Sequence, residues 1–216
     1  MGRRADHTPE QLHRMVLDAA RSIVRQHGLQ ALTTRKIANQ IGYTVGTLYQ
    51  IFENVDDLIE QMNAETLDQL RALCDEVDFS AGTAESLTRL VEKYVTFTNS
   101  EPLLWGAVIE HKLPKGYQRQ ELYVTTVLRL LGVVEKAIAP LFADEEKAAR
   151  LHDARLLWAC LYGISGLASA DRLAKEESVG RLAGTLIEIY IAARLPARRS
   201  PRPAGTPVLR GARRRP

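Results

Sequence analysis

The chain has 216 residues, of which 45% are hydrophobic and 25% are charged, a composition that favours a packed globular core and excludes global disorder. No apolar run approaches the roughly 20 residues that a membrane-spanning helix needs, and the first residues are too polar for a secretion signal. The two cysteines, Cys74 and Cys160, each stand alone among apolar residues, which is typical of free thiols in a reducing compartment. We therefore expect a soluble, cytoplasmic protein without a metal site, a cofactor or a membrane partner.

Charge is unevenly distributed along the chain, although the net charge is only +3. Residues 1–52 have an excess of 4 positive charges, residues 53–193 have an excess of 9 negative charges, and residues 194–216 contain 8 arginines and no acidic residue. Clustered basic residues indicate an anionic partner such as nucleic acid. Residues 196–216 are rich in proline and arginine and lack hydrophobic anchors, so we expect a disordered basic tail there.

Helical periodicity runs through nearly the whole chain, and no segment alternates as a strand would, so the expected fold is all-α. The first helix begins after Thr8, an N-cap type of residue, with Pro9 at its first position, and Gly28 ends it. Gly, Pro and capping residues set the remaining boundaries. The expected helices lie at about 9–27, 34–41, 45–51, 55–77, 83–99, 101–112, 118–139, 145–172 and 177–195.

The two short helices at 34–41 and 45–51 carry the main functional signal. Thr33 and Thr44 are N-cap residues for them, and Gly42 between them tolerates the positive φ of a sharp turn. Helices this short are not stable alone, so they must pack on the first helix. The pattern predicts a three-helix helix-turn-helix unit whose second short helix enters the major groove of DNA.

Side chains on the outer face of the second short helix have the chemistry that DNA recognition needs. Thr47 and Tyr49 offer hydroxyl groups to phosphates, Gln50 can pair with an adenine edge, and Val45 can meet a thymine methyl group. Basic residues stand at the start of the preceding helix, where free backbone N–H groups also attract phosphate. The expected DNA-binding residues are Thr33, Thr34, Arg35, Lys36, Tyr43, Thr44, Val45, Gly46, Thr47, Tyr49 and Gln50.

The same segment resembles the TetR family of transcriptional regulators. The resemblance covers about residues 10–60 and rests on the run from Thr33 to Ala38, on Gly42, and on Gly46-Thr47-Leu48-Tyr49 followed by Phe52. It implies a DNA-binding head on an α-helical body that binds a ligand and dimerises. Such one-component regulators usually repress transcription and leave DNA when a small molecule binds.

This resemblance divides the chain into a helix-turn-helix head at 1–54, a ligand-binding and dimerisation body at 55–195, and the basic tail at 196–216. A homodimer with two heads would read a near-palindromic operator whose half-sites lie about 34–36 Å apart. We expect a small-molecule effector to move the helix at 55–77 and so change the spacing of the two recognition helices.

Three residues depart from the family pattern. Tyr43 stands where a small aliphatic residue is usual, Ile51 where His or Tyr is common, and Val55 where Lys is common. The last two positions are often phosphate contacts, so their loss predicts a shallower salt dependence, by about one unit per lost cationic contact. Arg3 and Arg4, or the basic tail, are candidates to compensate.

The resemblance makes the last two helices the dimerisation candidates. The small residues that permit close helix approach are Gly163, Gly166, Ala168 and Ala170. The apolar stripe on the final helix consists of Leu186, Ile187, Tyr190 and Ile191. The alternative interpretation is that all of these residues form the core of one subunit.

Aromatic residues of the body are candidates for the effector pocket, because ligand pockets are mostly apolar with a few polar groups that fix orientation. The expected ligand-binding residues are Tyr94, Phe97, Trp105, His111, Trp158 and Tyr162. The alternative for each is an ordinary place in the hydrophobic core.

Two other classes of function remain open alternatives. A di-iron helical enzyme needs two Glu-x-x-His motifs, and the chain has one, from Glu10 to His13. Phosphate-binding loops, nucleophile elbows and Cys/His metal spacings are missing from the sequence, so we expect no catalysis. The second alternative is a helical adaptor or ligand-binding protein that has lost specific DNA binding, as the departures at Ile51 and Val55 would suggest.

Overall fold

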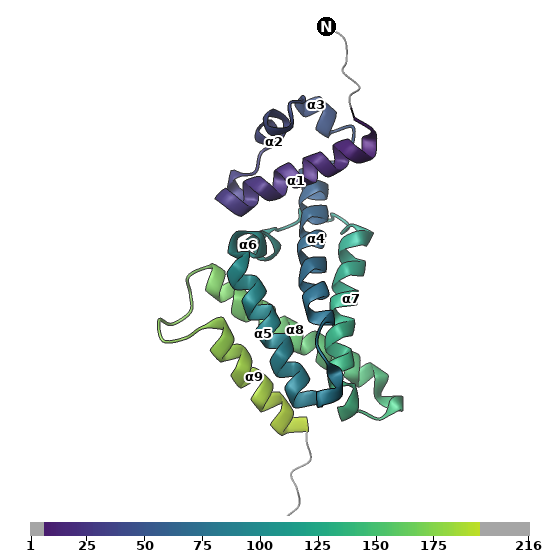
Figure 1. Ribbon diagram of the computed structural model, residues 1–216, viewed down its shortest axis with the longest axis vertical. Coiled ribbons are helices and arrows are strands. Elements are labelled where there is room, and N and C mark those ends of the chain that lie inside the picture. Colours follow the sequence, from purple (N-terminus) through teal and green to yellow (C-terminus); the bar gives the residue numbers. More distant parts are fainter. Residues whose placement is uncertain (1–6, 195–216) are drawn as a thin grey trace, which may run out of the picture.

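The computed structural model describes residues 7–194 and is all-α over that range, as predicted (Figure 1). The α-helices there are α1 (Pro9–His27), α2 (Thr34–Ile41), α3 (Val45–Leu48), α4 (Val55–Asp75), α5 (Thr83–Ser100), α6 (Pro102–Glu110), α7 (Glu121–Ile138), α8 (Lys147–Ser169) and α9 (Val179–Arg194). Short 3-10 turns occur at Leu29–Ala31, Phe79–Ala81, Ala139–Leu141 and Asp144–Glu146. The predicted basic tail, Arg3 and Arg4 lie outside the described residues.

The molecule is elongated, with α1, α2 and α3 forming a head at one end (Figure 1). Helix α4 runs from under the head into the body beside α7, while α5 and α9 pack together on the other side. Helix α6 lies directly beneath the head and contacts α1, α4 and α8. Within residues 7–194 we find no helix with the length and apolar character that crossing a membrane requires.

The amino end of α1 shows why local sequence determines where this helix begins. Thr8 Oγ1 accepts a hydrogen bond from the Gln11 N–H at 3.2 Å, and Gln11 Oε1 accepts one from the Thr8 N–H at 2.8 Å. This reciprocal capping box satisfies two backbone donors that the helix cannot pair itself. The predicted positions of Thr8, Pro9 and Gly28 at the ends of α1 are confirmed.

Two hydrophobic clusters form separate cores for the head and the body. The head core contains the buried faces of α1, α2 and α3, and it also takes Leu58, Ile59 and Met62 from α4 and Leu104 and Ala107 from α6. The body core gathers apolar residues from α4 to α9. The head core therefore extends beyond the predicted boundary at residue 54, and α4 and α6 contribute to both cores.

The second short helix is shorter than predicted. Helix α3 ends at Leu48, and the N–H groups of Gln50 and Ile51 bond to carbonyls three residues earlier, as in a tight 3-10 turn. Phe52 is buried in the head core directly after this turn. The prediction of a helix to residue 51 was wrong, because the chain turns inward to bury Phe52 instead of continuing the helix.

Candidate functional site

The turn between α2 and α3 has the geometry that the sequence predicts. Thr33 Oγ1 accepts a hydrogen bond from the Lys36 N–H at 3.3 Å, and Thr44 Oγ1 accepts one from the Thr47 N–H at 3.3 Å. Gly42 has φ 74°, in the left-handed region where a residue with a Cβ is strained. These three local features hold α3 at an angle to α2.

The predicted DNA-binding residues lie on α2, α3 and the turns around them, at the end of the head that points away from the body (Figure 1). Tyr49 is 53% exposed, so its ring and hydroxyl are accessible on this face. The other exposed members of the predicted set are Thr33, Arg35, Lys36, Thr44, Gly46 and Gln50. Thr34, Tyr43, Val45 and Thr47 are half-buried, and Val45 packs against the head core.

The three departures from the family pattern all have structural partners. Tyr43 Oη lies 2.7 Å from His7 Nδ1, and their rings meet edge to face, so Tyr43 links the residue before α1 to the helix-turn-helix turn. Ile51 and Val55 are half-buried against the head core. These two aliphatic side chains therefore stabilise the head at positions where a polar residue would point outward.

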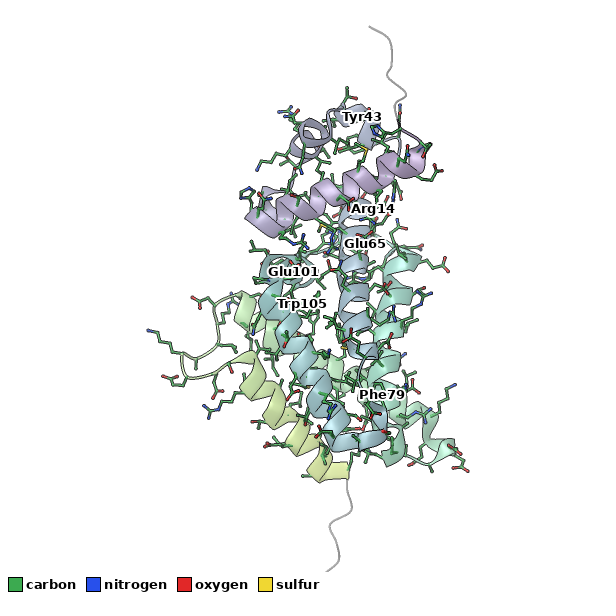
Figure 2. All side chains as sticks on the ribbon, in the orientation of Figure 1. Arg14, Tyr43, Glu65, Phe79, Glu101 and Trp105 are labelled. Atoms are coloured by element: carbon green, nitrogen blue, oxygen red, sulfur yellow. The ribbon has the colours of Figure 1, made fainter. Side chains whose placement is uncertain are left out.

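Ion pairs connect the head to the body along α1. Arg14 on α1 makes two hydrogen bonds to the carboxylate of Glu65 on α4, at 2.7 and 2.9 Å (Figure 2). Hydrogen bonds from Glu65 and from Asp18 raise the pKa of Arg14 above its ordinary value. Arg25 makes an equivalent pair with Glu101, at 2.9 and 2.8 Å. The first pair joins the head to α4, and the second joins it to the connection between α5 and α6.

Arg21 lies between these two ion pairs and is buried. Its guanidinium donates to Gln69 Oε1 at 2.8 Å and to Thr66 Oγ1 at 3.3 Å, both on α4, and it lies 3.7 Å from the Glu65 carboxylate. Burial lowers the pKa of Arg21, but an arginine keeps its charge in proteins. The seam between α1 and α4 is thus polar and fully partnered at this residue.

His111 takes part in a polar contact between two helices of the body. Its Nε2 lies 2.9 Å from Asp56 Oδ1, so the end of α6 is tied to the first turn of α4. His111 lines neither of the two cavities described below. The structure does not bring this residue together with the other predicted ligand-binding residues.

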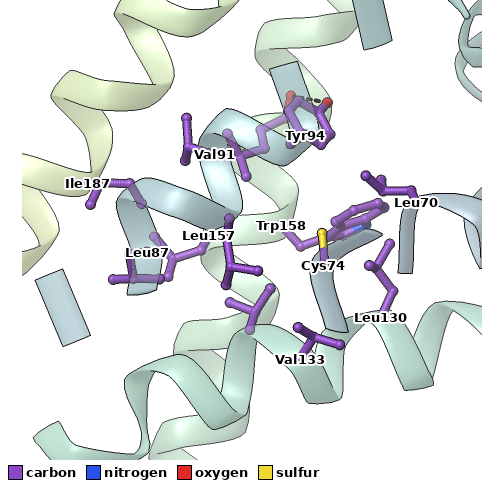
Figure 3. Close-up of a pocket in the computed structure, with 13 residues that line it drawn as sticks. Leu70, Cys74, Leu87, Val91, Tyr94, Leu130, Val133, Leu157, Trp158 and Ile187 are labelled. Atoms are coloured by element: carbon purple, nitrogen blue, oxygen red, sulfur yellow. Dashed lines mark hydrogen bonds between the residues drawn. The ribbon is translucent and has the colours of Figure 1, made fainter. Parts of the chain in front are cut away.

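The first cavity, which we call the core cavity, lies inside the body and has a volume of about 40 Å³ (Figure 3). The residues that line it are Leu70, Cys74, Leu87, Leu90, Val91, Tyr94, Leu130, Val133, Val134, Leu157, Trp158, Leu161 and Ile187. Burial raises the pKa of the Cys74 thiol to about 12, so this wall is uncharged at neutral pH. The core cavity is suited to an apolar ligand.

Five of the six predicted ligand-binding residues gather beside this cavity. The Trp105 ring meets Tyr94, Phe97 and Trp158 nearly edge to face, with centroids 5.3, 6.4 and 6.4 Å apart. Tyr162 packs beside Trp158 and donates its hydroxyl to the Val108 carbonyl at 3.2 Å. Tyr94 and Trp158 line the core cavity, whereas the other three support its wall.

The second cavity, which we call the junction cavity, lies where the end of α1 meets the body and has a volume of about 320 Å³. Its lining residues are Gly28, Leu29, Thr98, Asn99, Pro102, Leu103, Trp105, Gly106, Glu110, Ser165, Ala168, Ser169 and Val179. Sequence reasoning identified only Trp105 among them as a ligand-binding residue. The others are small, polar and aliphatic residues from separate parts of the chain, and only the tertiary fold brings them together. Within residues 7–194 no three His, Cys, Asp or Glu side chains gather as a metal site.

A helix-turn-helix head with an exposed recognition surface, joined through shared helices to a body that encloses an apolar cavity, defines a DNA-binding regulator of the one-component class. Two family models match the chain in that order. The model described as bacterial regulatory proteins of the tetR family matches residues 16–62, and the model described as a tetracyclin repressor-like C-terminal domain matches residues 87–190. Together they span more than half of the chain, which belongs to the TetR family and is a DNA-binding transcriptional regulator.

Solved structures of TetR regulators share the fold at low sequence identity. A TetR transcriptional regulator from Rhodococcus sp. RHA1 is 17% identical, with a TM-score of 0.63 over 86% of this chain and 97% of that one. FadR of Thermus thermophilus, a repressor solved with lauroyl-CoA, is 16% identical, with a TM-score of 0.65 over 89% and 100%. FadR of Bacillus subtilis, solved with stearoyl-CoA, is 17% identical, with a TM-score of 0.58 over 83% and 98%. None of the curated proteins compared with the chain matches it significantly.

Proposed function

We propose that the protein is a homodimeric repressor that leaves its operator when a small molecule binds in the body. The observation that carries this proposal is that α6 contributes to both cores. Leu104 and Ala107 pack in the head core, whereas Trp105 and Val108, each one residue further along α6, pack in the body core. A ligand that displaces Trp105 therefore acts on the same short helix that supports the head.

Helix α4 joins the same route. Asn63 on α4 is buried, and its Nδ2 donates to the Ala107 carbonyl on α6 at 3.2 Å. The predicted movement of the helix at 55–77 would therefore be accompanied by movement of α6. Such a switch works only when the ligand binds the two arrangements of the head with different affinity.

The core cavity favours an effector with an apolar chain. The lining residues are apolar apart from the Tyr94 hydroxyl, the Cys74 thiol and the indole N–H of Trp158. The two FadR structures were solved with acyl-CoA molecules, which carry such a chain. We infer an apolar chain from the cavity.

The exposed face of α8 is the best candidate for a dimer interface. Leu156, Ala159, Gly163 and Leu167 follow one another at helical spacing and are exposed, and Ile189 on α9 is also exposed. An exposed apolar stripe of this kind indicates a partner surface. On α9, Ile187 and Tyr190 are buried in the body core and Leu186 and Ile191 pack against it, which favours the core alternative for the predicted stripe.

Two glycines provide a matched test of this interface. A Cβ atom added at Gly163 on α8 or at Gly132 on α7 meets no atom within 4 Å, and both residues are exposed. Gly163→Glu would place a charge in the proposed interface, whereas Gly132→Glu would place it on a different helix. Light scattering after size exclusion should show a dimer for the Gly132 variant and a monomer for the Gly163 variant. A dimer in both would reject the α8 interface.

DNA binding is tested by fluorescence anisotropy with the duplex just upstream of the protein's own gene and with a scrambled duplex, each at two salt concentrations. Selective binding that weakens with salt supports a specific DNA reader, because phosphate contacts release counterions. Equal affinity for the scrambled duplex, for the duplex upstream of the protein's own gene and for duplexes from neighbouring promoters, at both salt concentrations, would favour the adaptor alternative. Turnover of an added metabolite would favour an enzyme.

A further inference from the structure

A contact between two side chains separates the core cavity from the junction cavity. Tyr94 on α5 lines the core cavity, and Ser165 on α8 lines the junction cavity. Their hydroxyl groups form a hydrogen bond with each other. The Tyr94 hydroxyl also donates to the Leu161 carbonyl at 3.3 Å, and the dashed line in Figure 3 marks this second bond. Both side chains are buried. The wall between the cavities at this point thus consists of rotatable polar side chains.

Trp105 adds a hydrogen-bond donor to the same wall. It lines the junction cavity, its ring meets Tyr94 edge to face, and the residue is 3% exposed. Its indole N–H lies close to the Tyr94 hydroxyl but makes no hydrogen bond of good geometry to a described residue. Buried donors of this kind are almost always paired in proteins. A ligand atom that accepts a hydrogen bond would satisfy this one.

The charge of the junction cavity restricts the kind of group that fits. Among the described residues that line it, Glu110 is the only charged side chain, and the other polar members carry hydroxyl or amide groups. An anionic group would meet a carboxylate and no cation there. A quaternary ammonium group would be attracted to Glu110 but offers no acceptor to the Trp105 N–H. An uncharged group with a carbonyl oxygen satisfies both conditions.

We propose that the two cavities form one site for an uncharged amphipathic effector, with its apolar chain in the core cavity and an ester, amide or lactone carbonyl at Trp105, Tyr94 and Ser165. The chain enters when the Tyr94 and Ser165 side chains separate. This inference rests on the proposed effector-regulated function and names the chemical class of the effector. Gly28 and Leu29, which directly follow α1, also line the junction cavity, so the site borders the head.

The test uses the chain's two tryptophans as reporters. Four probes share an eleven-carbon chain with a bromine at its end: methyl 11-bromoundecanoate, 1-bromoundecane, 11-bromoundecanoate and the 11-bromoundecyl trimethylammonium ion. Bromine quenches tryptophan fluorescence on contact, and Trp158 lines the core cavity. We expect saturable quenching by the ester, with binding at least about 10-fold tighter than for the carboxylate or the ammonium ion. Equal or tighter binding of either charged probe would overturn the assignment to an uncharged effector.

Trp105→Phe tests the carbonyl contact, because it removes the N–H and keeps an aromatic ring. We expect the ester to bind about 3- to 10-fold more weakly to this variant, which corresponds to one lost hydrogen bond, and the bromoalkane to bind with unchanged affinity. Trp158→Phe is the matched control; because it lacks the tryptophan that lines the core cavity, its affinities are measured by isothermal titration calorimetry, and it should keep the preference for the ester. A ratio of ester to bromoalkane affinity that is the same in the Trp105 variant and the wild type would refute the contact, and no saturable quenching by any probe would refute the chain site.

Operator binding, measured in parallel, separates this inference from the proposed function. If the ester binds as expected but leaves operator affinity unchanged, the two-cavity site stands and the proposed release mechanism fails. If another compound releases the operator while no probe binds, the release mechanism stands and the two-cavity site fails.

Discussion

Leu104→Ala tests whether α6 supports the head. Leu104 is 1% exposed and lies in the head core, whereas the adjacent Leu103 is 42% exposed. Truncation of a fully buried leucine removes its transfer free energy and leaves a cavity, which together lower the free energy of unfolding by about 2–5 kcal/mol. The same change at Leu103 should lower it by less than about 0.5 kcal/mol. The two variants differ by one position on one helix, so helix propensity is the same for both.

Urea unfolding followed by circular dichroism measures this difference, at one protein concentration because dimerisation contributes to apparent stability. Operator affinity is measured on the same samples. We expect Leu104→Ala to weaken operator binding under native conditions, since its cavity lies under α1, while tryptophan fluorescence from Trp105 and Trp158 still reports a packed body. If the Leu103 and Leu104 variants lose equal stability and bind the operator equally, α6 does not support the head and the proposed coupling route is wrong.

Three further predictions concern the head, the core cavity and α4. Tyr49→Ala should weaken binding to operator and scrambled duplexes alike in anisotropy titrations, whereas Gln50→Ala should mainly reduce the preference for the operator; identical effects would contradict these roles. Because burial raises the pKa of Cys74 to about 12, its contribution to stability is complete below pH 9 and falls by about 1.4 kcal/mol per pH unit above it. The free energy of unfolding of Cys74→Ala, measured with urea, should not show this loss above pH 9. If the free energies of the variant and the wild type fall in parallel as the pH rises, the role of Cys74 is refuted. Arg119→Ala should lower the free energy of unfolding by about 1–2 kcal/mol, because Glu60 is fully buried with Arg119 Nη1 at 3.1 Å, while Arg119 is half-exposed and the Gln120 N–H still donates to the carboxylate at 2.9 Å. Glu60→Gln in the same protein should restore most of that loss, and a double-mutant cycle without coupling would exclude the pair.

Features that depend on neighbouring residues were predicted well from the sequence. Thr8, Thr33 and Thr44 act as N-caps, and Gly42 takes a positive φ, because each requirement is set within one helical turn. The all-α fold and the helix-turn-helix unit follow from such local rules together with the periodicity of apolar residues. The end of α3 was placed too late because burial of Phe52 depends on the packing of α1 and α4, which periodicity does not encode.

Features that depend on distant elements were predicted only in part. The aromatic residues around Trp105 were found because bulky aromatic side chains in a helical body tend to meet in its interior. His111 was placed with them by residue type, but it faces Asp56 on α4. Ser165 gave no signal in the sequence, since its role depends on the position of Tyr94 more than seventy residues earlier. Ile51 and Val55 were interpreted as missing phosphate contacts, and the structure gives each a place against the head core.

The connection between the head and the body combines half-exposed ion pairs at its edge with a buried interior that contains Arg21 and the apolar contacts of α6. The Arg14–Glu65 and Arg25–Glu101 pairs have half-exposed arginines, so each contributes at most about 1 kcal/mol. The packing of Leu104 in the head core contributes several times as much, as estimated above. A change in head orientation can therefore break peripheral ion pairs at a small cost while α6 stays in the head core. This difference in energy favours rotation of the head about α6 over separation of the head from α6. The pivot then lies beside the junction cavity. A ligand bound there needs only a few kcal/mol of differential affinity to shift the equilibrium between the two head orientations.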